Sequence, residues 1–272
     1  MKQQAIDANN PDASWRALYF AGAVAAILAV AIFRRNLGVE LHTFDGFGVF
    51  DVPGEWPITA HEWFSLLQAD PFVGLVLFGI VDLVNYVLVG IIFLALYGAL
   101  RRVNRAAMLV VTTSCFVGIA VYFASNQSFS MLSLSSKYAA AATNVEMDSF
   151  LAAGEALLAI HDPGSLYQGI GIYASLFLVL AAGLTISIIM LKSAVFNKAT
   201  AIVGILANGI ALFYFITLLI TPEFVWIPHT LSAPLRLIWY ILIAVKLIQL
   251  GMRSKDENSD QSVTPGSLTS DE

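Results

Sequence analysis

Six apolar segments, each about as long as a bilayer is thick, dominate this chain of 272 residues. A transmembrane helix needs about 20 consecutive apolar residues to cross a hydrocarbon core of about 30 Å. Because backbone polar groups must find partners within the segment itself, such stretches cross lipid as helices. We therefore predict six transmembrane helices, at residues 17–33, 71–100, 106–125, 169–191, 199–220 and 235–251.

The composition agrees with a membrane location. Hydrophobic residues make up 58% of the chain, charged residues only 12%, and the mean hydropathy is +0.77. A soluble domain carries about 25% charged residues. The expected fold is an all-α integral membrane six-helix bundle over residues 1–252, followed by a disordered acidic tail at 253–272. The single cysteine, Cys115, excludes a disulfide framework within one chain.

Lysine and arginine positions predict the orientation, since cytoplasmic loops carry an excess of these residues. The turn between the second and third segments holds Arg101, Arg102 and Arg105. Placing this turn in the cytoplasm also places both termini there. Two long connections, 36–70 and 126–168, then lie on the outer side.

Each outer connection contains a capping box, in which a threonine caps a helix and a glutamate three residues later bonds back to it. The boxes are Thr59–Glu62 and Thr143–Glu146. They predict a short helix at 60–68 and an amphipathic helical hairpin within 126–168. The sequence leaves open whether the hairpin is a lid over the bundle, an interface, or a surface element with a packing role.

We single out four polar residues within the predicted spans, where ionisable groups are costly and by default functional. They are Asp82, Asn85, Asn208 and Lys246. Eleven helical rises from the starts of the second and sixth segments place Asp82 and Lys246 each ~16 Å along its helix. These two helices run in the same direction, which predicts equal depth and a buried ion pair.

This polar cluster has two interpretations. In the first, the ion pair and the two asparagines hold the helices in register, as membrane hydrogen bonds do at about 0.6 kcal/mol each. In the second, the cluster lines a polar cavity for a proton, an ion or a small polar ligand. Lys246 can also extend toward the cytoplasm and leave Asp82 neutral.

Histidine beside carboxylate suits zinc, and every histidine here has an acidic residue nearby. The four are His42, His61, His161 and His229. None shows His-x-x-x-His spacing, so we expect solvated loop histidines in place of a metal site. No phosphate-binding loop, hydrolase elbow or H-E-x-x-H motif occurs. We expect no catalysis, and the sequence indicates no particular cofactor.

Several stretches resemble a family of uncharacterised prokaryotic multi-pass membrane proteins. They are Ala95–Asn104, Tyr122–Asn126, Met131–Ser135, Tyr138–Ala141, Leu151–Ala159 and Ile238–Ala244. The resemblance covers most of residues 60–251. The family is classed as a domain of unknown function, so the resemblance implies a helical fold in the prokaryotic plasma membrane without an activity.

The first hypothesis is a non-enzymatic protein that binds a lipid or other amphiphile, or that serves as a subunit of a membrane complex. The alternative is a small proton- or ion-coupled transporter that uses Asp82 and Lys246. The expected partners are the lipid bilayer, a bound lipid and other membrane subunits. Nothing in the sequence supports nucleic-acid binding.

Overall fold

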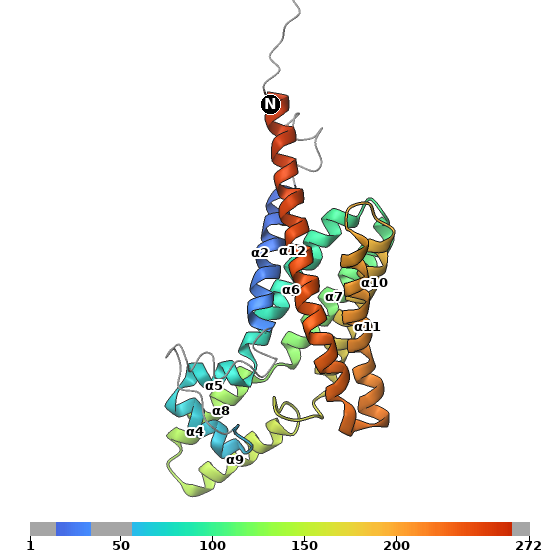
Figure 1. Cartoon of the computed structure of the whole chain (residues 1–272). Helices are drawn as coiled ribbons and strands as arrows, with labels where there is room; N and C mark the ends of the chain where they lie inside the picture. Colours follow the sequence, from blue (N-terminus) through green and yellow to red (C-terminus); the bar gives the residue numbers. More distant parts are fainter. Residues whose placement is uncertain (1–14, 34–55, 263–272) are drawn as a thin grey trace, which may run out of the picture.

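The computed structural model describes residues 15–33 and 56–262, and this part of the chain contains helices and no strand (Figure 1). Its elements are α2 (Arg16–Phe33), α4 (Ala60–Ala69), α5 (Pro71–Phe78), α6 (Ile80–Leu100), α7 (Arg105–Ser125), α8 (Ser128–Ala140), α9 (Asn144–Leu158), α10 (Ile170–Leu191), α11 (Lys198–Ile220), the 3-10 turn η3 (Pro222–Phe224) and α12 (Trp226–Ser262).

Six of these helices form a closed ring in the order α2, α6, α7, α10, α11 and α12, with α12 returning to α2 (Figure 1). By length and composition, five segments of the described chain can cross a membrane, and α2 is a shorter apolar helix. Helices α7, α10 and α11 each lie within one residue of a predicted span.

The other four helices, α4, α5, α8 and α9, form what we call the side layer, at the lower left of Figure 1. The layer has its own apolar core, in which Trp63, Phe64, Phe78 and Met131 are completely buried. We call the end of the ring next to this layer proximal, and the end at the Arg101–Asn104 turn distal.

Side-chain caps determine where several helices begin. Both predicted capping boxes are present, at Thr59 before α4 and at Thr143 before α9. Asp70 caps α5 by accepting hydrogen bonds from the amides of the second and third helical residues, with Pro71 at the first position. The helices predicted at 60–68 and within 126–168 are therefore present.

The second predicted span, 71–100, is not one continuous helix. Gly79 has a φ of 113°, in the left-handed region, and separates α5 from α6. Glycine adopts this conformation without the steric cost that a Cβ would bring. Because α5 belongs to the side layer, the ring helix begins only at Ile80. Asp82 therefore lies in the first turn of α6, near the proximal end, and not ~16 Å along a span.

The last helix is longer than predicted at both ends. It begins at Trp226, before the predicted start at 235, and contains Pro234 in its interior. Membrane helices tolerate proline because neighbouring groups satisfy the freed carbonyl. The helix continues to Ser262, so the first part of the predicted disordered tail is helical. The rest of the tail lies outside the described residues.

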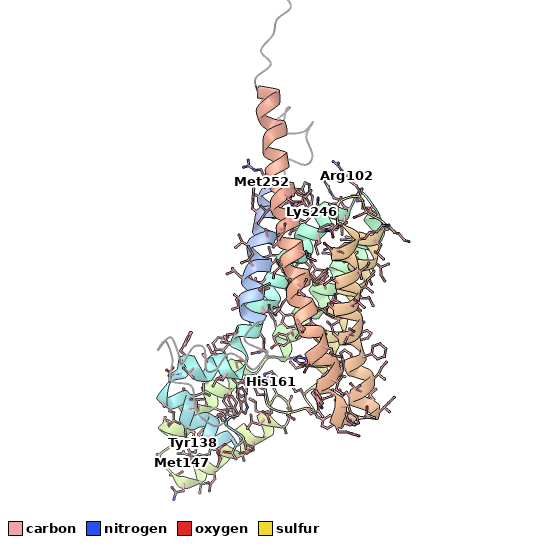
Figure 2. All side chains as sticks on the ribbon, in the orientation of Figure 1. Arg102, Tyr138, Met147, His161, Lys246 and Met252 are labelled. Atoms are coloured by element: carbon pink, nitrogen blue, oxygen red, sulfur yellow. The ribbon has the colours of Figure 1, made fainter. Side chains whose placement is uncertain are left out.

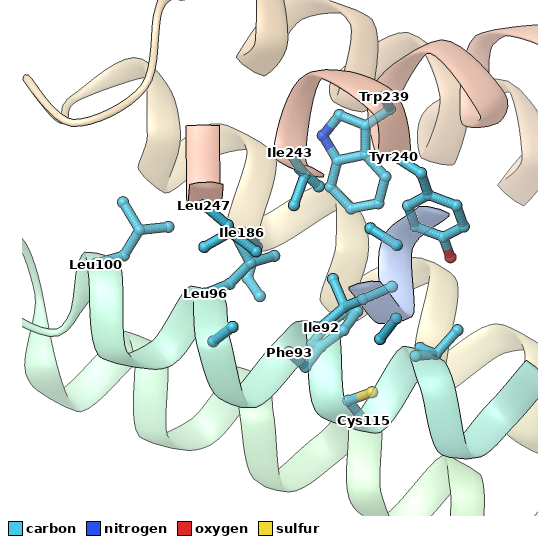
Figure 3. Packing of buried hydrophobic residues seen from close by; sticks show 14 of the residues in the cluster. Ile92, Phe93, Leu96, Leu100, Cys115, Ile186, Trp239, Tyr240, Ile243 and Leu247 are labelled. Carbon is cyan, nitrogen blue, oxygen red and sulfur yellow. The ribbon is translucent and has the colours of Figure 1, made fainter. Parts of the chain in front are cut away.

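Apolar side chains fill the distal half of the ring (Figure 3). Leu96, Ile186, Ile243 and Leu247 are almost completely buried there. Gly204 lets Trp239 approach closely, since a Cβ built on it would lie 2.3 Å from the indole Nε1. Close helix approach through small residues is the usual way in which membrane helices pack.

Replacing Gly79 by alanine should destabilise the fold by about 1–2 kcal/mol, the cost of a left-handed backbone with a Cβ. A Cβ there would meet its nearest neighbour, Asn126 Nδ2, at 3.6 Å, so the cost is conformational and not steric. Thermal unfolding of the detergent-purified protein measures it. Gly209→Ala is the matched control, because a Cβ on this helical glycine would meet nothing closer than 4.0 Å. Equal stability of the two variants would contradict this account.

Candidate functional site

A cavity of about 660 Å³ lies between the proximal end of the ring and the side layer. Its main walls come from the ring helices α6, α10, α11 and α12. Tyr122 of α7, Trp56 and the loop that follows α9 complete the lining. This volume is typical of small-molecule sites, which occupy about 300–1,000 Å³. Three of the four predicted polar residues, Asp82, Asn85 and Asn208, line it.

The α6 wall of the cavity is polar. Asp82, Asn85 and Tyr86 project into it from consecutive turns, because residues three and four apart share a helix face. Asn85 is 9% exposed, and its Oδ1 has no hydrogen-bond partner. The Tyr122 hydroxyl lies within interaction range of the Asp82 carboxylate. This wall therefore presents carboxylate and amide oxygens to the cavity.

The α12 wall carries the opposite charge. Arg236, Trp239 and Tyr240 share one face of α12 at the same three- and four-residue spacing, and His229 lies two turns earlier. A guanidinium keeps its proton in proteins, so Arg236 is a cation inside the cavity. Arg236 was not predicted as a site residue. The sixth helix was expected to begin at residue 235, just after Pro234, so Arg236 fell at its outer end.

Arg236 is the cation that shares the cavity with Asp82. Asp82 lines the cavity from α6, and Arg236 lines it from α12. Tyr86 on α6 interacts electrostatically with both charged groups.

Lys246 lies elsewhere. It is absent from the cavity wall, ten residues or ~15 Å beyond Arg236 along α12. Its neighbour Leu247 packs near Gly22 and Ala95, in the distal half. Figure 2 shows Lys246 near the Arg102 end of the molecule, and His161 farther away, between the ring and the side layer. The predicted equal depth of Asp82 and Lys246 is not found, because α6 starts later and α12 starts earlier than the apolar pattern indicates.

Asn208 has a structural role at the inner edge of the cavity. Its Nδ2 donates to the Gly204 carbonyl at 2.8 Å, one turn back on the same helix. Its Oδ1 lies against Gly183 of α10, where a Cβ would be only 2.4 Å away. Asn208 therefore joins α10 and α11 in close packing.

The loop at 161–168 covers the cavity on the side of α9 and α10. Its conformation depends on Tyr173 of α10, whose hydroxyl donates to the Leu166 carbonyl and accepts from the Gln168 amide. The Gln168 Nε2 donates to the Asp162 carbonyl at 3.0 Å. These bonds hold the loop against the ring.

His161 is the most enclosed polar residue of this loop. It is 4% exposed, and its ring packs 5.4 Å from that of Phe78. Neither ring nitrogen forms a hydrogen bond of normal geometry. Burial lowers the pKa of His161, against the opposing effects of the Phe78 carbonyl and Asp162. The imidazole is therefore a neutral group facing the cavity, with one donor and one acceptor to offer.

The histidines do not assemble into a metal centre in the described part of the chain. His161 and His229 both line the cavity, His61 lies on α4 with its ring 6.2 Å from Tyr138, and His42 is outside the described residues. Within the described ranges, no three histidine, cysteine or acidic side chains are close enough to share an ion.

Comparisons with protein-family models, with curated proteins and with solved structures found no match to this chain. The resemblance over residues 60–251 therefore remains a prediction.

Acid should destabilise this protein partly through His161. Its pKa is lower when folded than the ordinary value of 6.5, so the unfolded chain binds the proton more readily. The stability contributed by neutral His161 is therefore present above about pH 6.5 and lost as the pH falls below it. His161→Phe keeps the ring but cannot be protonated, and should reduce the fall in melting temperature between about pH 7 and pH 5.

The control for this measurement is His61→Gln, at an exposed position outside the cavity. Its melting temperature should fall between about pH 7 and pH 5 by as much as that of the unaltered protein. An undiminished response in His161→Phe would rule out His161 as its source.

Proposed function

We propose that this protein is an integral membrane protein of the prokaryotic plasma membrane, with all six ring helices crossing the bilayer and both termini in the cytoplasm. Support comes from the five long apolar segments and from the arginine-rich turn at the distal end. In this orientation the side layer and the cavity mouth face outward.

Within that frame, we propose that the protein binds a small amphiphile in the cavity. The observation that carries the proposal is the set of buried polar atoms that lack partners there, Asn85 Oδ1 and both ring nitrogens of His161. Leaving such an atom unsatisfied costs about 1–3 kcal/mol. A ligand whose polar groups form hydrogen bonds with these atoms would remove that cost.

The distribution of lining residues favours an amphiphile over a fully polar ligand. Asp82, Asn85 and His161 lie toward the proximal end, whereas Val89 and Phe93 form part of the apolar inner end. A molecule with a polar head at the mouth and a chain pointing inward matches both regions. The volume suits one acyl chain, because two would exceed the space of about 660 Å³.

A carrier that uses Asp82 with Lys246 has less support. Lys246 does not line the cavity, and buried apolar residues fill the ring between the two levels. Replacing Asp82 by asparagine should leave any pH-dependent uptake by reconstituted vesicles unchanged. An uptake activity lost in Asp82→Asn, with the protein still folded, would favour the carrier.

Native mass spectrometry of the gently extracted full chain tests binding directly. We expect a bound amphiphile of one chain in the unaltered protein. In Asn85→Leu, occupancy should fall at least tenfold, an effect equivalent to about 1.4 kcal/mol. The melting temperature of the empty variant should not fall, because an apolar side chain of similar size replaces an acceptor that has no partner.

Gln249→Leu is the matched control, since this residue is exposed on α12 and does not line the cavity. It should retain full occupancy. If the extracted protein carries no amphiphile, the proposal is contradicted. If another protein co-purifies in its place, this chain is a subunit of a membrane complex.

A further inference from the structure

The loop that joins α9 to α10 covers the cavity and is closed at its base. Residues along most of its length line the cavity: His161, Pro163, Gly164, Ser165, Leu166 and Gln168. At the base, the Gly169 amide donates to the Ile160 carbonyl at 2.7 Å. Compact surface loops whose two ends meet are often functional. We call residues 161–168 the cover loop.

Hydrogen bonds within the cover loop hold it together as one unit. The Asp162 carboxylate accepts from the Gly164 amide at 2.9 Å, and the Asp162 carbonyl accepts from the Ser165 amide at 3.0 Å. The Ser165 hydroxyl donates to the Tyr167 carbonyl at 3.1 Å and accepts from the Tyr167 amide at 3.2 Å. None of these bonds involves a ring helix, so the loop keeps its own structure when its contacts with the ring change.

The connection between the cover loop and the ring depends on one hydroxyl group. The Tyr173 hydroxyl on α10 donates to the Leu166 carbonyl and accepts from the Gln168 amide at 3.0 Å. In the part of the chain that the structure describes, no other hydrogen bond joins residues 161–168 to a ring helix. His161 packs its ring on Phe78 of the side layer without a hydrogen bond of normal geometry. The cover loop is thus an internally bonded unit with a single polar attachment to the ring.

We propose that the cover loop is a lid over the cavity and that the Tyr173 hydroxyl is the latch that holds it closed. When both latch bonds break, the loop moves as a unit about its base at Ile160 and Gly169, and the cavity opens. This inference rests on the proposed function, because it describes how the bound amphiphile enters and leaves. Opening of such loops commonly limits the rate of ligand release.

A latch of this kind controls rates more than affinity. The lid has to open both before binding and before release, so a weaker latch should speed the two steps by the same factor. Tyr173→Phe removes the hydroxyl and keeps the ring. We expect the lid to open about tenfold more often in this variant, which corresponds to a loss of about 1.4 kcal/mol in the stability of the closed lid.

Chemical modification of His161 measures lid opening without any ligand. The imidazole belongs to the cover loop, is 4% exposed and packs on Phe78, so diethylpyrocarbonate reaches it when the loop moves away. Modification of the full chain in a non-ionic detergent is read for each residue by mass spectrometry. His161 should react about tenfold faster in Tyr173→Phe than in the unaltered protein. The exposed His61 gives the intrinsic rate of the reagent and should not change.

Two controls separate lid opening from a general loss of packing. Cys115 is buried in the ring, and its reaction with N-ethylmaleimide should stay equally slow in Tyr173→Phe. Tyr97→Phe removes a tyrosine hydroxyl from α6 outside the cavity and should leave the reactivity of His161 unchanged. A parallel rise in the reactivity of Cys115 would overturn the latch, because the ring itself would then have loosened.

The rates of ligand exchange test the consequence for binding. The probe is dansylaminoundecanoic acid, a single-chain amphiphile whose dansyl group accepts energy from tryptophan, and Trp56 and Trp226 line the cavity. Stopped-flow mixing gives the association rate, and displacement by excess oleic acid gives the dissociation rate. In Tyr173→Phe both rates should rise about tenfold, while the dissociation constant stays within about threefold of that of the unaltered protein.

The results distinguish failure of the latch from failure of the binding proposal. Unchanged reactivity of His161 in Tyr173→Phe overturns the latch. So does a dissociation constant that rises about tenfold with an unchanged association rate, since the hydroxyl would then act on the ligand and not on the lid. If the probe does not bind the unaltered protein and no amphiphile co-purifies, the proposed function is overturned, and the reactivity of His161 still decides whether the loop is latched.

Discussion

The left-handed backbone at Gly79 is the constraint on which the arrangement of this protein depends. It lets the chain leave the side layer and enter the ring of helices within one residue, so α5 and α6 belong to different layers. The Gly79 carbonyl accepts from Asn126 Nδ2 at 3.4 Å, which connects the turn to the end of α7. Phe78, just before the turn, packs on His161, and Asp82 follows just after it. Both sides of the cavity mouth are thus positioned by one turn.

Packing explains why the cavity is proximal and not central. In the distal half, glycines allow side chains to interlock closely, as where Gly22 packs against Ala95 and Leu247. In the proximal half, large aromatic and charged residues occupy the helix faces, and the space between them is not filled.

Local signals predicted the helices well where local interactions decide the outcome. The capping boxes at Thr59 and Thr143 depend only on neighbouring residues. The polar cluster was predicted in part, because Asp82, Asn85 and Asn208 do meet at one cavity. Its cation was missed, because depth was counted from segment ends that Gly79 and Pro234 displace. An apolar pattern does not show a change in backbone handedness or a proline that continues a helix.

The sequence by itself determined that this chain is helical and that its long apolar segments suit a bilayer, and it singled out some of the polar residues that meet inside. Those properties follow from side-chain chemistry and helical periodicity alone. Only the tertiary structure decided which residues face one another. Arg236 and not Lys246 shares the cavity with Asp82, and His161 comes from a distant loop to complete it. The physical reason is that helix starts, ring order and the Gly79 turn set relative depth, and these depend on long-range packing.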